Sequence, residues 1–153
     1  LHLIDDEIYL KIRSMTGKEW TEGFAYSVYE NVKKHRYFIT NLGKCTQVDA
    51  RPLSDNVYLK YLDLLKMEFQ LVCPKVIILF GNQVSSIVLG EKISVSEVRR
   101  KCFLREIGGR VYKFYAVYYP VGNGRFNIDK SIADINWIME HEGIKKHDEV
   151  VSS

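Results

Sequence analysis

Polar and glycine residues follow the apolar runs of this sequence at three places. Asn41 lies near the end of YFITNL (37–42), and Gly81-Asn82-Gln83 come directly after KVIILF (75–80). The third place is the stretch from Tyr119 to Asn127, which follows a run rich in aromatic and β-branched residues. In sheets whose strands run parallel, ligands bind outside the carboxyl ends of the strands. These places are therefore the candidate ligand-binding segments.

The residue types at these places are suited to hydrogen bonding with a ligand. The side-chain amide of Asn41 offers both a donor and an acceptor. Gly122, Asn123, Gly124 and Arg125 suit a backbone that lies close to a phosphate, with backbone amides and an arginine as donors. A purely structural role stays open for both: Asn41 as a turn at a strand end, and 122–125 as an ordinary Gly-Asn-Gly turn with a surface arginine.

Alternating helices and strands are predicted to position these segments. Apolar residues at helical spacing predict helices over about 20–34 and 55–72, a short helix after Gly81 that ends at Gly90, and a last helix. The buried side of the last helix is predicted to carry Ile128, Ile132, Ile135 and Ile138. Strands are predicted over 37–42 and 75–80, with a hairpin over 102–120 that turns at Gly108-Gly109. This order predicts the α/β class: a three-layer α/β/α sandwich with a mostly parallel central sheet.

Size and composition fit one globular domain. The chain has 153 residues, of which 46% are hydrophobic and 27% charged, with a net charge of +3. We expect a single domain over 1–142 and a flexible tail over 143–153. No apolar run is long enough for a membrane span and no leader opens the chain, so a cytoplasmic location is expected. Cys73 and Cys102 sit among apolar residues and are predicted to be small core side chains.

Several stretches, read in order, resemble one known family. YFITNLGKC, CPKVIILFGNQVSSIVLG, a Gly-Gly hairpin and YYPVGNGRFN resemble the uracil-DNA glycosylase superfamily, most closely its iron–sulfur-containing bacterial and archaeal branch. The resemblance spans roughly 37–140. It implies a uracil-DNA glycosylase-like fold, uracil-containing DNA as the partner, and a role in base-excision repair that uses a base flipped out of the DNA stack.

The resemblance also implies roles for particular residues. Asn41 would read the edge of the flipped uracil, and Phe24 would stack on it. Phe24 also lies on a helical stripe with Trp20, so packing there is the alternative, and Tyr26 would then be the stacking residue. Tyr119 stands where the family has a histidine before a proline, so it would assist departure of the base as a hydrogen-bond donor without a positive charge. Gly122, Asn123, Gly124 and Arg125 would hold DNA phosphate.

Two departures from the family bear on chemistry. Of the four cysteine ligands that the family's iron–sulfur cluster requires, only Cys45 has a counterpart, so no cofactor is expected. The family's first motif, a glycine- and proline-containing turn with the residue that positions the attacking water, has no counterpart. The only acidic candidates before Asn41 at the chain start are Asp5, Asp6 and Glu7. Either the sequence begins after the missing strand, or the protein has rebuilt or lost the catalytic acid.

Three functions therefore stay open. The first is hydrolysis of the N-glycosidic bond of a flipped, deaminated base in DNA. The second is a catalytically impaired or inactive member of the fold that acts as a nucleic-acid or nucleotide binding module. The third is a flavodoxin-like domain in which the Gly81-Asn82-Gln83 turn holds a phosphate at a helix N-terminus.

Overall fold

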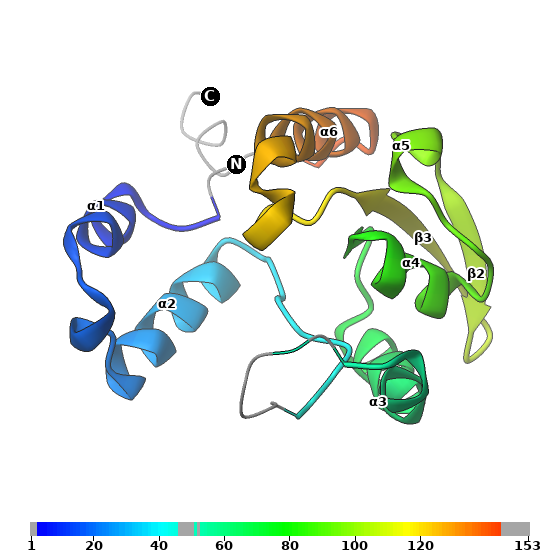
Figure 1. Cartoon of the computed structure of the whole chain (residues 1–153), viewed down its shortest axis with the longest axis horizontal. Coiled ribbons are helices and arrows are strands. Elements are labelled where there is room, and N and C mark those ends of the chain that lie inside the picture. Colours follow the sequence, from blue (N-terminus) through cyan, green and yellow to red (C-terminus); the bar gives the residue numbers. More distant parts are fainter. Residues whose placement is uncertain (1–2, 46–50, 52, 145–153) are drawn as a thin grey trace, which may run out of the picture. The chain divides into compact units, whose positions relative to one another are not determined.

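The chain divides into two compact units. A computed structural model describes residues 3–45, 51 and 53–144, and Figure 1 shows the elements in chain order. The N-terminal unit comprises Leu1–Thr40 together with 145–153, and the sheet unit comprises Asn41–Ile144. Most of the predicted tail, 145–153, lies outside the described residues. The single domain expected over 1–142 stays a prediction.

Helices make up most of the described part of the N-terminal unit. Helix α1 spans Asp6–Ser14, a 3₁₀ turn η1 spans Gly17–Glu19, and α2 spans Glu22–Lys34. Helix α2 confirms the helix predicted over 20–34, and it begins at Thr21, whose hydroxyl accepts the Phe24 backbone N–H at 3.2 Å. Such a side-chain cap satisfies one of the amides that a helix start leaves unpaired.

Asp5 connects the two ends of this unit. Its carboxylate accepts hydrogen bonds from the Asn31 amide at 2.7 Å and the Lys34 ammonium at 3.0 Å, and it lies 2.7 Å from His35 Nε2. Hydrogen bonds from Asn31, Lys34 and His35 hold the pKa of Asp5 well below its usual range. The start of α1 is thereby fixed to the end of α2.

The strand predicted over 37–42 is wrong. The chain is irregular there, and Phe38 and Ile39 are 57% and 52% exposed. A strand requires a hydrogen-bonded neighbour, and the three strands found among the described residues do not pair with this segment. Leu42, by contrast, is buried in the main core, so the segment is anchored just after Asn41.

The sheet of the second unit has the order β1-β3-β2. Strand β1 (Ile77–Phe80) pairs parallel with β3 (Arg110–Val117), and β2 (Phe103–Ile107) pairs antiparallel with β3. The predicted hairpin is confirmed: Gly108 and Gly109 turn it with φ of +60° and +80°, a region that glycine enters without steric cost. The sheet of the described residues is therefore mixed rather than mostly parallel.

Helices cover both faces of this sheet (Figure 1). Helices α3 (Asp55–Val72) and α4 (Asn82–Leu89) lie on one face, where the Phe69 and Phe114 rings are 5.8 Å apart. Helix α6 (Ile128–His141) lies on the other, where Trp137 meets Tyr115 at 6.5 Å. Two shorter elements, α5 (Val95–Val98) and η2 (Gly122–Asn127), complete the unit. The unit thus has the three layers expected of the α/β class.

The buried face of α6 differs from the prediction. Ile135 and Ile138 are buried, as expected, but Ile128 and Ile132 are 43% and 40% exposed. Ser131 and Asp134 are buried in their place, and the Ser131 hydroxyl donates to the Tyr118 carbonyl at 2.6 Å. At the start of α6 the buried face is therefore the one that carries Ser131 and Asp134, and Ile128 and Ile132 lie partly exposed beside it.

The two cysteines predicted to be core side chains are exposed. Cys73 ends α3 in the left-handed conformation, with φ of +50°, and its thiol donates to the Gln70 carbonyl at 3.0 Å. Cys102 comes just before β2. Both cysteines lie at the end of a helix or strand, where the chain reaches the surface, so their apolar neighbours in the sequence did not imply that they are buried. Across the described residues, no helix is both long and apolar enough to cross a membrane.

Candidate functional site

A crevice opens where β1 and β3 end. The Gly81 N–H donates to the Val117 carbonyl at 2.8 Å, so the two parallel strands finish side by side. After this point the chain from β1 enters α4 on one face of the sheet, whereas the chain from β3 enters η2 and then α6 on the other. Connections that part to opposite faces leave a crevice at the strand ends, which is where ligands bind in α/β sheets.

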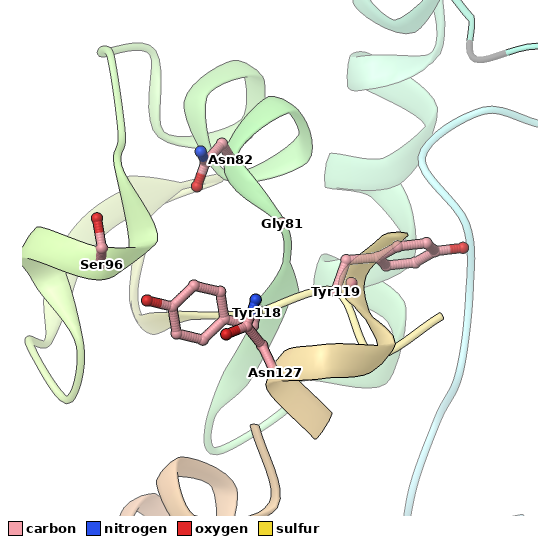
Figure 2. A pocket seen from close by; sticks show the side chains of 7 residues that line it. Gly81, Asn82, Ser96, Tyr118, Tyr119 and Asn127 are labelled. Atoms are coloured by element: carbon pink, nitrogen blue, oxygen red, sulfur yellow. The ribbon is translucent and has the colours of Figure 1, made fainter. Parts of the chain in front are cut away.

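The pocket in this crevice has a volume of about 380 Å³ and is open to solvent. Its walls carry backbone amides, two side-chain amides, a hydroxyl and two phenols, as Figure 2 shows. The lining residues are Gly81, Asn82, Ser96, Tyr118, Tyr119, Gly124 and Asn127. Pockets of about 300–1,000 Å³ hold small organic ligands. A single heterocyclic base with part of its sugar is of suitable size.

The turn from β1 into α4 forms one wall. Gly81 has φ of +87°, and a Cβ placed on it would lie 3.4 Å from the Tyr119 Cβ. Asn82 accepts the Val95 backbone N–H on its side-chain oxygen at 2.9 Å, which leaves the amide nitrogen as a donor at the pocket. The first-turn backbone amides of α4 lie at the same wall and favour a ligand that carries negative charge. The Gln83 amide nitrogen instead donates hydrogen bonds to the Leu53 carbonyl and the Asp55 carboxylate.

The two tyrosines after β3 point in opposite directions. The ring of Tyr118 projects toward Ser96, whereas the ring of Tyr119 projects the other way (Figure 2) and is 55% exposed. Tyr118 also packs against the main core, which fixes its ring. Tyr119 lines the pocket as the sequence predicts, but Tyr118 is the phenol whose ring faces Ser96 across it. The catalytic role of Tyr119 stays a prediction.

The loop after Pro120 closes onto the backbone of Tyr119. A Cβ at Gly124 would collide with the Tyr119 carbonyl, so only glycine permits this approach. Gly122 turns the chain with φ of +60°. Arg125 is exposed and lies 5.1 Å from the centre of the Phe126 ring. The side chain of Asn123 lies outside those described. Of the four residues predicted to hold phosphate, the pocket lining includes Gly124.

Asn41 and Phe24 are not among the residues that line this pocket. Asn41 is exposed, next to the buried Leu42, and the following Lys44 forms an ion pair with Glu68 of α3 at 2.8 Å. Phe24 belongs to the N-terminal unit, where its ring packs edge-on against Trp20 at 5.1 Å and lies 4.9 Å from the Lys11 ammonium. The alternative of local packing for Phe24 thus has direct support, and the base-binding roles of both residues stay predictions.

The described donors do not fit an iron–sulfur cluster. Cys45 is the last residue described before α3 apart from 51 and 53–54, Cys73 ends α3, and Cys102 precedes β2. Within the described part of the chain, no group of three or more His, Cys, Asp or Glu side chains is placed to hold a metal ion. The expectation that the protein has no cofactor stays a prediction.

Sequence reasoning missed two lining residues. Tyr118 continues the alternation of Tyr112, Phe114 and Ala116, which face α3 and α4, so strand periodicity could have identified it as an anchored side chain at the strand end. Ser96 gave no comparable signal, because the turn that leads into α5 brings it to the pocket from outside the strands.

This arrangement defines a class: α/β proteins with a polar ligand pocket at the carboxyl ends of adjacent parallel strands. The family model described as the uracil DNA glycosylase superfamily matches residues 11–137, and the chain belongs to that superfamily. No curated protein matches the chain. The match is to the superfamily as a whole, so membership of the iron–sulfur branch stays a prediction.

Proposed function

We propose that this protein is a cytoplasmic uracil-DNA glycosylase-like enzyme of base-excision repair, which takes a uracil flipped out of DNA into the crevice between β1 and β3. The position of the crevice supports the proposal. This chain belongs to the superfamily, and its pocket of about 380 Å³ lies at the carboxyl ends of two parallel strands. Extrusion of the base is required, since its glycosidic bond cannot be reached inside the stack.

The groups around the crevice suit a uracil. The carbonyls of the base need donors, and its N–H needs an acceptor. The Asn82 amide nitrogen, the Asn127 amide and the Tyr118 hydroxyl supply such groups. In this proposal Asn41 reads the base edge from the segment beside the main core and Phe24 stacks on the base. Gly122, Asn123, Gly124 and Arg125 hold the DNA backbone.

The chemistry is hydrolysis of the bond between the sugar and the base. Water attacks the sugar carbon as the base leaves with a negative charge, so donors aimed at the base stabilise the transition state more than the ground state. Tyr118 and Tyr119 are the phenols next to this position, and the first-turn amides of α4 favour the same charge. A phenol supplies no positive charge, so catalysis slower than with a protonated histidine is expected.

A second function is favoured by the composition of the lining. No Asp or Glu is among the seven lining residues, so this pocket brings no carboxylate that could position a water molecule. A protein that binds an extruded base without cleaving its bond is therefore the alternative proposal.

Both are tested with the full chain and a single-stranded oligonucleotide that contains one uracil, compared with its thymine counterpart. The enzyme proposal expects release of free uracil, and Tyr118→Phe should slow release by about 10²-fold, the usual effect of removing one donor to a developing anion. Asn41→Asp should abolish release or the preference for uracil. Tyr29→Phe, at an exposed position of α2, is the control and should change neither.

Preferential binding of the uracil strand without release would establish the binding module instead. Equal affinity for both strands and no release would overturn both proposals.

A further inference from the structure

Two cations flank the ring of Tyr118. The Arg99 guanidinium carbon lies 6.0 Å from the ring centre, and the Lys130 ammonium lies 5.6 Å from it. The same ring lines the crevice and projects toward Ser96 (Figure 2). Arg99 follows α5 and Lys130 belongs to α6, so segments far apart in the sequence bring two positive charges to one edge of the pocket.

A buried carboxylate fixes the orientation of the first cation. Asp134 is 0% exposed and accepts two hydrogen bonds from Arg99, from Nε at 2.7 Å and from Nη2 at 3.0 Å. Arg100 Nε donates to the same carboxylate at 2.9 Å. Burial raises the pKa of Asp134, but the hydrogen bonds from Arg99 and Arg100 outweigh it and lower the pKa overall. Asp134 is therefore charged, and the two-point contact fixes the plane of the Arg99 guanidinium.

Two arginines share this one carboxylate, so a net positive charge remains. Arg99 keeps Nη1 without a partner among the described residues, and its side chain is 33% exposed. Arg100 takes part with φ of +61°, a conformation that non-glycine residues rarely adopt. A strained backbone at Arg100 is difficult to explain by charge neutralisation, because Arg99 alone would already neutralise Asp134.

Lys130 is a cation at a helix N-terminus, where helices usually favour acidic residues. It lies in the first turn of α6, where the positive end of the helix dipole disfavours a cation. In the described part of the chain it forms no ion pair, and neither the adjacent Asp129 nor Glu97 of α5 is ion-paired with Lys130 or Arg99. Among the described residues its contact with the Tyr118 ring is favourable, but the ammonium has no anionic partner there.

We propose that Arg99 and Lys130 form a phosphate-binding site beside Tyr118, which takes the DNA phosphodiester next to the extruded nucleotide. This inference rests on the proposed function and deepens it. Asp134 is a positioning residue, because it holds the Arg99 guanidinium so that its free edge faces the ligand. A phosphodiester fits because it is the anion that every nucleotide of a DNA strand carries beside its base.

The test removes one negative charge from the DNA strand and one positive charge from the protein. The full chain is titrated with single-stranded uracil oligonucleotides in which a neutral methylphosphonate replaces one phosphate at a time. Wild-type protein should lose affinity at one position next to the uracil. Lys130→Gln should lose affinity with the normal strand and should respond more weakly to that substitution, because Arg99 alone then contacts the phosphate. Lys60→Gln, which removes a charge from an exposed position on α3, is the matched control and should behave as the wild type.

The salt dependence gives a second readout. Each phosphate neutralised on a single strand contributes about 0.7 to the slope of log affinity against log salt. Lys130→Gln should lower the slope by about that amount, so that raising salt fourfold weakens its binding about 2.6-fold less than wild-type binding. The urea midpoint of this variant should not fall, because a cation leaves the first turn of α6.

Identical methylphosphonate profiles and slopes for Lys130→Gln and wild type would overturn the phosphate site. A failure of the proposed function is distinguishable. In that case uracil and thymine strands bind equally, while the fall in slope for Lys130→Gln still supports the site.

Discussion

The positions of Tyr118 and Tyr119 differ by one residue, and that difference decides which phenol is anchored. Side chains of a strand alternate between its faces, and the alternation of β3 carries Tyr118 onto the α3 and α4 side of the core. Tyr119 falls in the opposite register and is largely exposed. A motif comparison aligns a residue with a family position, but the strand register determines where its hydroxyl points.

Replacing Asp134 should have a clear effect on stability. We expect Asp134→Asn to lower the free energy of unfolding by about 2 kcal/mol at neutral pH, because it weakens hydrogen bonds to two charged guanidinium groups. Urea unfolding monitored by circular dichroism measures this. Asp63→Asn, at an exposed position of α3 with no ion pair in the described structure, should change stability by less than about 0.5 kcal/mol.

The Asp134→Asn variant should also change how stability depends on pH. The folded state lowers the pKa of Asp134 below its ordinary value of 3.8, so below that pH the unfolded state binds more protons than the folded state. The stabilisation is complete above about pH 4 and is lost as the pH falls through the folded-state pKa. Wild-type stability should therefore fall more steeply than that of Asp134→Asn below about pH 4. Parallel curves would contradict the charged, hydrogen-bonded state of Asp134.

Helix α6 forms where the sequence predicts a last helix, but it buries a different face. The isoleucine spacing predicted one continuous stripe, whereas the buried face begins with Ser131 and Asp134 and only then continues with Ile135 and Ile138. The polar residues are buried because each has a partner, the Tyr118 carbonyl or the two arginines. Burial of a polar group is tolerated where its hydrogen bonds are made.

Two isoleucines of this helix provide a matched pair of variants. We expect Ile138→Ala to lower the free energy of unfolding by about 2–5 kcal/mol, because Ile138 is 0% exposed and truncation leaves a cavity. Ile132 is 40% exposed, so Ile132→Ala should cost about 1 kcal/mol or less. Chemical denaturation of both variants measures the difference. Equal losses would contradict the face of α6 described here.

At the scale of the whole molecule, the sheet unit contains the three strands of the described residues and the helical layers on both faces of their sheet. We therefore expect the fragment 41–144 to unfold cooperatively by itself, since its core needs no residue from 1–40 to complete the described cluster. Urea titration followed by both fluorescence and circular dichroism tests this. Non-coincident or absent transitions in the fragment would instead support the single domain expected over 1–142.

The sequence was informative where local chemistry decides structure. The hairpin follows from Gly108-Gly109, the end of α4 from Gly90, and the span of α3 from its apolar periodicity. It was misleading where long-range pairing decides. YFITNL has strand-forming residues, yet no described strand pairs with it. Within the candidate site, Tyr119 and Gly124 were predicted, whereas Ser96 and the orientation of Tyr118 depend on how distant segments meet.

The hydrogen bond from Gly81 to Val117 gives the crevice an internal probe. It forms the last link between the two parallel strands, and Gly81, which donates it, is half-buried and lines the pocket. We expect a molecule that occupies the crevice to shield this amide and to slow exchange of its proton with deuterium. One backbone resonance therefore reports occupancy for ligands that carry no label.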